Sequence, residues 1–201
     1  MIKLAGITQD SITDGPGLRF VIFTQGCPHH CPDCHNPQTW TCEGGIQYTT
    51  EQLLNELDKN PMTQGVTISG GEPFMQSPAL IPFAQGVKAR KLELAIYTGY
   101  TFEELTSPKE IKKFACEINH SSQKNNSHVG ATGSRPFEPS PQVHPHLQLL
   151  HLCDILIDGK FDTTQKSHDL KFKGSHNQRT LDVKKSLEQN TPIPTTNTKW
   201  V

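Results

Sequence analysis

The chain lacks the features that would place it in several common classes of protein. Of its 201 residues only 33% are hydrophobic and 7% aromatic, and 19 basic residues face 20 acidic ones, for a formal net charge of −1. A nucleic-acid surface needs an excess of positive charge, and a membrane span needs a long apolar run. We therefore expect neither nucleic acid nor a membrane as a partner.

From the sequence pattern we expect no secretory leader. Residues 1–7 turn polar too early for a signal peptide. We therefore expect a cytoplasmic protein, in a compartment where thiols stay reduced and available to metal. The length is sufficient for one domain with a core of its own.

Hydrophobic residues are scarcest in two segments. Residues from about 119 to 142 are mostly small or polar, with several Ser, Asn, Gly and Pro, and such a segment buries too little to offset its ordering entropy. The segment 189–201 has a similar composition. We expect a domain over residues 1–188, interrupted by a disordered insertion at about 119–142 and followed by a flexible tail.

Short apolar runs alternate with helical patterns along the rest of the chain. Strands are expected at about 3–8, 18–24, 65–69, 92–97 and 154–158, and helices at about 49–57, 77–91, 102–118 and 145–152. This alternation predicts an α/β fold with a mainly parallel sheet. Because the core is short for eight strands, we expect a partial, open (β/α) barrel, with its site at the carboxyl ends of the strands.

Three cysteines follow the second expected strand with the spacing C-x3-C-x2-C: Cys27, Cys31 and Cys34. Three thiolates can hold an iron–sulfur cluster and leave one iron without a protein ligand. Zinc is an alternative, with a neighbouring histidine as the fourth ligand. The spacing alone leaves both open. The other cysteines, Cys42, Cys116 and Cys153, are scattered and are expected to be bystanders.

Further polar residues follow later strands. The turn Gly70-Gly71-Glu72-Pro73 lets a ligand approach the backbone closely, and Glu72 is able to accept from an ammonium group; in isolation it is also an ordinary turn. Tyr97 and Thr98 fit either a pocket wall or the core. Asp158 and Lys160 fit either a site or a solvated loop.

The cysteine motif followed by GGEP resembles the radical S-adenosylmethionine enzymes. The resemblance implies a [4Fe-4S] cluster on the three cysteines, with S-adenosylmethionine bound at the open iron. It places Gly70, Gly71 and Glu72 at the methionine amino group, where a Cβ on Gly71 would intrude on the ligand. It also implies contacts from Asp33, Cys34 and His35, although many members have an aromatic residue where Asp33 stands.

Two further segments, DGPGLRF at 14–20 and CHNPQTW at 34–40, are similar to those of the glycyl-radical-enzyme activases. The elements YTGY at 97–100, IDGKF at 157–161 and GSHNQR at 174–179 resemble the activases of anaerobic ribonucleoside-triphosphate reductase. The resemblance implies an oxidoreductase that takes a hydrogen atom from a glycine of that reductase's glycyl radical subunit.

The same resemblance implies a low-potential electron donor such as flavodoxin or ferredoxin. Two alternatives remain open from the sequence: an activase of the pyruvate formate-lyase type and, in a different class, a zinc-stabilised binding module without catalysis. The segment at about 119–142 has no counterpart in the family pattern.

Overall fold

The computed structural model describes residues 1–107 and 144–201. The insertion expected at about 119–142 lies outside these described residues. So do Cys116 and most of the helix expected over 102–118. Within the described ranges, no helix is long and apolar enough to cross a bilayer.

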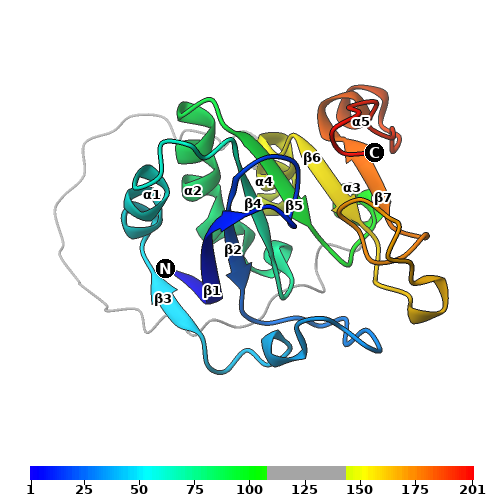
Figure 1. Ribbon diagram of the computed structural model, residues 1–201, viewed down its shortest axis with the longest axis horizontal. Helices are drawn as coiled ribbons and strands as arrows, with labels where there is room; N and C mark the ends of the chain where they lie inside the picture. Colours follow the sequence, from blue (N-terminus) through cyan, green and yellow to red (C-terminus); the bar gives the residue numbers. More distant parts are fainter. Residues whose placement is uncertain (108–143) are drawn as a thin grey trace, which may run out of the picture.

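Seven strands in the described ranges form one mixed sheet. They are β1 (Ile2–Ser11), β2 (Arg19–Thr24), β3 (Ile46–Tyr48), β4 (Gly65–Gly70), β5 (Glu93–Tyr97), β6 (Ile155–Asp158) and β7 (Arg179–Asp182). Their order across the sheet is β3-β1-β2-β4-β5-β6-β7, as Figure 1 shows. All five expected strands are present, whereas β3 and β7 were not expected.

The strand directions divide the sheet into a parallel centre and antiparallel edges. The neighbours β2, β4, β5 and β6 are all parallel. On one side β1 runs antiparallel to both β2 and β3, and on the other β7 runs antiparallel to β6. The α/β class is thus confirmed, with four central strands whose carboxyl ends point to the same edge of the sheet.

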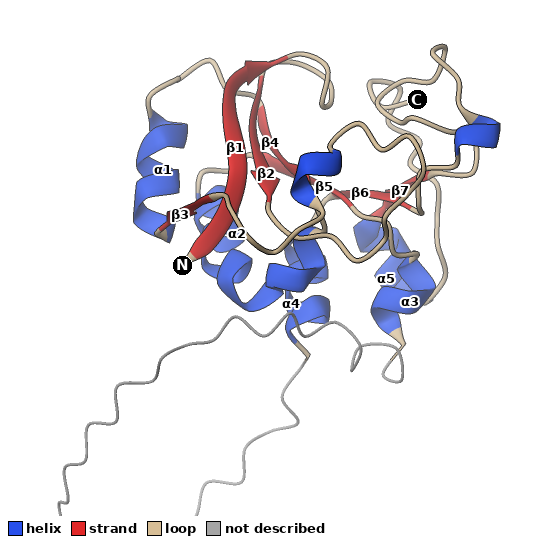
Figure 2. Ribbon diagram, turned by 90° about the horizontal axis from the view of Figure 1, so that it is seen from below, coloured by secondary structure: helices blue, strands red, loops and turns tan. Residues whose placement is uncertain are grey.

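The helices are α1 (Thr50–Asp58), α2 (Ser77–Ala89), α3 (Phe102–Thr106), α4 (Pro145–Leu152) and α5 (Val183–Gln189). Figure 2 shows them together on one side of the sheet. Their starts follow the local sequence: Thr49 caps α1 with Gln52 completing a capping box, and Thr101 with Glu104 does the same for α3. The helix α5 was not expected.

The two faces of the sheet carry different side chains, because successive strand residues point to opposite sides. One set packs with the helices in the main core, including Phe20, Ile22, Val66, Ile68, Leu94, Ile96 and Leu156. At the intervening positions, Ala95, Ile155 and Ile157 form a smaller cluster on the other face, together with Trp200 from the C-terminal segment. The helices therefore leave this second face to be covered by loops and by the C-terminal segment.

A buried arginine organises that second face. The side chain of Arg19 is 1% exposed, and its Nε donates to Thr67 Oγ1 over 2.7 Å. Its Nη1 pairs with Glu93 at 2.9 Å, and its guanidinium carbon lies 5.1 Å from the ring centroid of Trp200. Because a buried charge is costly unless it is paired, these partners are needed for Arg19 to remain inside.

The segment 189–201 is packed rather than loose, which differs from the flexible tail expected from its composition. Thr195 N donates to Thr180 O over 2.9 Å. Trp200 is 1% exposed, donates from Nε1 to Glu93 Oε1 over 3.1 Å and stacks edge-on against Phe172. The partners of Trp200 are distant in sequence, so local composition gave no sign of this packing.

We predict that Trp200→Ala lowers the free energy of unfolding by about 3–5 kcal/mol, because it removes a large buried side chain and leaves a cavity. Urea denaturation of the metal-free protein measures this change. The neighbouring exposed Lys199→Ala is the control and should stay within about 0.5 kcal/mol of the parent chain. Equal stability of the two variants would mean that the segment does not support the fold.

Candidate functional site

The candidate site lies at the carboxyl ends of the four parallel strands. The cysteine loop follows β2, the glycine-rich turn follows β4, Thr98 and Gly99 follow β5, and Gly159 to Phe161 follow β6. Figure 1 shows the blue cysteine loop running from the end of β2 to β3. Ligand sites of parallel α/β folds form at this edge.

Backbone hydrogen bonds close the base of the cysteine loop. Gly26 N donates to Thr39 O over 2.8 Å, and Cys27 N donates to Trp40 O over 3.1 Å. Within the loop, Cys34 N donates to Cys31 O over 3.2 Å. The loop is therefore a defined structure, with its three thiols held on one short segment.

All three thiols of the motif are free and half-buried. Burial raises the pKa of Cys27 to about 11 and also raises that of Cys31. The metal-free thiols of Cys27 and Cys31 are therefore protonated at neutral pH, and a bound metal would have to displace those protons. The three cysteines of the motif are the donor set of a cluster with one open iron, so these residues fit such a group. Cys42 belongs to the same loop but lies outside the motif.

The histidines beside these cysteines have different surroundings. His29 Nε2 lies 2.8 Å from Glu72 Oε2. The rings of His30 and Trp40 meet edge-on, and the His35 ring lies 5.4 Å from that of Phe161. In the described ranges no three His, Cys, Asp or Glu side chains are gathered around one ion-sized point.

The glycine-rich turn packs directly against the base of the cysteine loop. Gly71 N donates to Thr24 O and Glu72 N donates to Gly26 O, both over 2.8 Å. Gly70 has φ +93°, a conformation that favours glycine. A Cβ on Gly71 would lie 2.3 Å from Gly26 O. The position therefore excludes a side chain because of this chain's own backbone, whereas the sequence had suggested a bound ligand as the reason.

Glu72 is fully buried and its carboxylate is satisfied within the protein. Its oxygens accept from Thr98 Oγ1 (2.9 Å), Gly99 N (2.9 Å) and Phe74 N (3.0 Å), and from the imidazole of His29. The sequence had suggested that this carboxylate meets an ammonium group of a cofactor. The structure instead places it beneath the loops, where it joins the ends of β4 and β5 to the cysteine loop.

A cavity of about 380 Å³ opens beside two of the three thiols. Of the expected site residues, five line it: Cys31, Cys34, His35, Gly70 and Tyr97. The others that line it come from the N-terminal turn, the ends of β2 and β4, the cysteine loop and the segment 161–178, and include Asp14, Phe23, Asn36, Ser69, Phe161, Phe172, Lys173, Gly174 and Gln178. Such a volume is within the range of small-molecule sites.

Seven expected residues do not line this cavity: Cys27, Asp33, Gly71, Glu72, Thr98, Asp158 and Lys160. Asp33 is exposed, with φ 55°, and accepts from Thr163 Oγ1 over 2.8 Å. It therefore joins the cysteine loop to the segment that follows β6. Thr98 is buried, and its hydroxyl serves Glu72.

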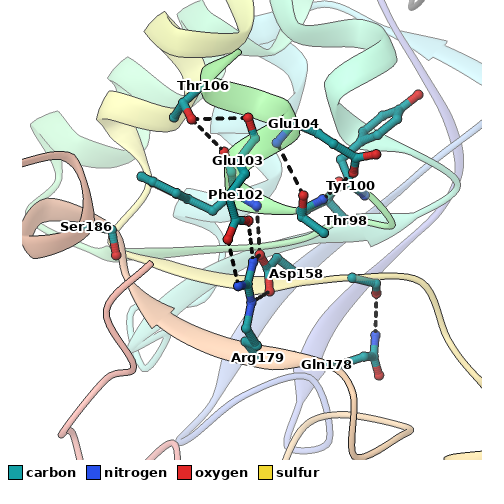
Figure 3. A network of polar contacts seen from close by, with 12 residues as sticks. Thr98, Tyr100, Phe102, Glu103, Glu104, Thr106, Asp158, Gln178, Arg179 and Ser186 are labelled. Atoms are coloured by element: carbon teal, nitrogen blue, oxygen red, sulfur yellow. Dashed lines mark hydrogen bonds and ion pairs between the residues drawn. The ribbon is translucent and has the colours of Figure 1, made fainter. Parts of the chain in front are cut away.

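Asp158 and Lys160 border a second hollow of about 430 Å³. Asp158 is 1% exposed; it pairs with Arg179 and accepts from Phe102 N over 2.8 Å, as Figure 3 shows. Arg179 also pairs with Glu103 at 2.7 Å, and this contact lowers the pKa of Glu103 to about 2. The carboxylate of Asp158 thus fixes β6 to β7 and α3, whereas Lys160 is exposed.

Sequence reasoning missed several residues that build the site. His29 carried no signal beyond its place between two cysteines. Asp14 belongs to a turn that is unremarkable except for its family resemblance, and Phe172 and Lys173 lie in a polar stretch without periodicity. Tertiary contacts alone bring these residues to the cavity.

The sequence was compared with known families and proteins. The family model described as 4Fe-4S single cluster domain matches residues 13–181. The anaerobic ribonucleoside-triphosphate reductase-activating protein of Escherichia coli K12 is 27% identical over 175 residues, covering 83% of this chain and 90% of that protein. The pyruvate formate-lyase-activating enzyme of Clostridium pasteurianum is 33% identical over 147 residues, covering 69% of this chain and 61% of that enzyme. The structure of QueE from Escherichia coli aligns with a TM-score of 0.42 at 19% identity, covering 50% of this chain and 53% of that one.

We predict that Gly71→Ala destabilises the metal-free protein by about 1–3 kcal/mol, because the new Cβ is forced against Gly26 O and cannot be accommodated without a backbone shift. Gly6→Ala is the matched control, since a Cβ there has nothing within 4 Å. Denaturant unfolding of both variants provides the comparison. If the two variants unfold at the same denaturant concentration, the close approach at Gly71 is not a constraint on the fold.

Proposed function

Because the chain belongs to the 4Fe-4S single cluster domain family, we propose that it is a glycyl-radical-enzyme activase that acts on anaerobic ribonucleoside-triphosphate reductase. The observation that carries the proposal is the cavity at the strand ends. It is lined by the thiols of Cys31 and Cys34 and by the backbone of Gly70, so a molecule bound there lies directly beside a cluster. An iron–sulfur oxidoreductase needs this arrangement of a cluster next to a shielded pocket.

Cys27, Cys31 and Cys34 hold the [4Fe-4S] cluster in this proposal. S-adenosylmethionine occupies the cavity, whose walls include Gly70, His35 and Tyr97. When bound, the two groups together supply a 5′-deoxyadenosyl radical. The chain's own part is to position S-adenosylmethionine, to keep water out through Phe161 and Phe172, and to leave one side open to the substrate.

Several expected contacts take a supporting place in this proposal. Glu72 and Thr98 hold the strand ends together from below, and Gly71 provides a close backbone approach. Asp33 stands where an aromatic residue would pack on adenine, so the base is held by the ring of His35 and by backbone groups. Asp158 and Lys160 border the second hollow, at the side from which a substrate loop would approach.

The choice between the two activases rests on coverage and on the cavity wall. The alignment covers 90% of the reductase-activating protein and 61% of the pyruvate formate-lyase activase. Gly174 and Gln178 belong to the GSHNQR element that resembles the reductase activases. Both line the cavity, where they are placed to meet a substrate.

The remaining parts of the proposal concern the context of the site. We take the open sheet to be an incomplete barrel, the region at about 119–142 to be an insertion that leaves the site intact, and the compartment to be the cytoplasm. A flavodoxin or ferredoxin supplies the electron. The partner's glycine-bearing loop closes the open side and presents its Cα–H.

We predict that alanine at Cys27, Cys31 or Cys34 abolishes the cluster, because each thiolate holds one iron. After anaerobic reconstitution the parent chain should be brown, with iron and sulfide in equal amounts, and each variant should be colourless. Cys42→Ala is the control and should keep the full content. A loss with Cys42→Ala as complete as that with Cys31→Ala would contradict the ligand assignment, and a colourless parent chain with one bound zinc would favour the binding module.

The substrate is tested by mixing the protein, S-adenosylmethionine, a reductant and one candidate partner without oxygen. We expect a glycyl radical doublet in the electron paramagnetic resonance spectrum with anaerobic ribonucleoside-triphosphate reductase. Without a partner, methionine and 5′-deoxyadenosine should form only slowly. A doublet on pyruvate formate-lyase and none on the reductase would overturn the choice of partner and leave the other activase as the function.

A further inference from the structure

We propose that His29 is a positioning residue for the cluster, anchored by Glu72, and that it fixes the part of the loop that surrounds Cys27. The inference rests on the proposed function only in that the loop carries a cluster. It assigns the Glu72 carboxylate to this anchor.

The first observation is the contact itself. The side chain of His29 is 5% exposed although it belongs to a loop, and its Nε2 lies 2.8 Å from Glu72 Oε2, which is fully buried. The same carboxylate is fixed from two other directions by Thr98 Oγ1 and Gly99 N. His29 is therefore attached to a rigid point at the ends of β4 and β5.

The second observation is the fit of the imidazole. It meets the Tyr100 ring edge-on, with centroids 4.4 Å apart. A Cβ on Gly99 would lie 2.3 Å from His29 Cδ2, so the strand end after β5 has room for the imidazole only because residue 99 is glycine. The space is shaped for this side chain, which indicates more than an incidental surface contact.

The third observation connects His29 to the metal ligand. The backbone N–H of His29 donates a hydrogen bond to the Cys27 thiol, as does that of His30. Hydrogen bonds to cluster sulfurs stabilise the extra negative charge of the reduced state and so set the reduction potential. Because the imidazole holds the backbone of residue 29 in place, losing its anchor should weaken this hydrogen bond.

The test compares His29→Gln with His29→Asn. Glutamine can place an amide nitrogen near the position of the imidazole Nε2 and donate to Glu72, whereas asparagine is too short. His30→Asn is the matched control, since the residue is exposed; its Nδ1 lies 3.2 Å from Pro28 O, and its ring meets that of Trp40 edge-on. Each chain is reconstituted without oxygen, and three quantities are measured: iron content, the rate of cluster loss to a chelator, and the midpoint potential from a redox titration followed by electron paramagnetic resonance.

We expect His29→Asn to lose its cluster several-fold faster than the parent chain and to shift the potential to a more negative value. His29→Gln should restore both quantities, and His30→Asn should match the parent chain. A merely structural role would change the stability of the metal-free protein but not the potential. The inference is overturned if His29→Asn keeps the parent potential and rate of loss, or if His29→Gln behaves like His29→Asn.

The outcomes also separate this inference from the proposed function. A parent chain that holds no iron–sulfur cluster removes the proposed function, whatever the variants do. A parent chain that holds the cluster, together with a His29→Asn variant that matches it in both measurements, removes the anchoring role alone.

Discussion

The buried carboxylate of Glu72 is the interaction on which the site depends. An ionised carboxylate away from water is costly unless every oxygen is hydrogen-bonded. Here the donors come from the end of β5, from the turn after β4 and from the cysteine loop after β2. Because the buried carboxyl oxygens of Glu72 need these donors, three strand ends that are distant in sequence are held in one arrangement.

The second face of the sheet is stabilised by a different balance of charge, at the amino ends of β2 and β5. Arg19 is held between Thr67, Glu93 and the ring of Trp200. A Cβ on Gly15 would meet both Arg19 and Trp200 at less than 3 Å, so the turn that carries Asp14 rests on this buried pair. The C-terminal segment is thus part of the support for the cavity wall.

The sequence predicted those features that have a local signal. The five apolar runs are each contained in a short segment, and each was found as a strand where expected. The strand β3 was missed because two of its three residues are exposed. The strand β7 was missed because it follows a polar stretch and its partners, β6 and Pro194, are not its neighbours in sequence.

Predictions that needed distant partners were less successful. Composition alone suggested a flexible tail at 189–201. The segment is ordered because Trp200 packs against Arg19 and Glu93, which are distant in sequence. The carboxylate of Glu72 was assigned to a cofactor because the motif does not reveal which donors will surround it. For the same reason the cavity walls at Phe161 and Phe172 could be found only in the folded chain.

The cysteine loop and its enclosure differ in when they become available during synthesis. All three thiols belong to one segment near the N-terminus, whereas part of the cavity wall comes from Tyr97 of β5 and from the segment 161–178. Since the chain emerges from the ribosome N-terminus first, the ligands are exposed to the cell well before the fold that protects them exists. A cluster delivered during translation would therefore be exposed to dioxygen. A cluster delivered after release would lie at once beside the folded walls of the cavity.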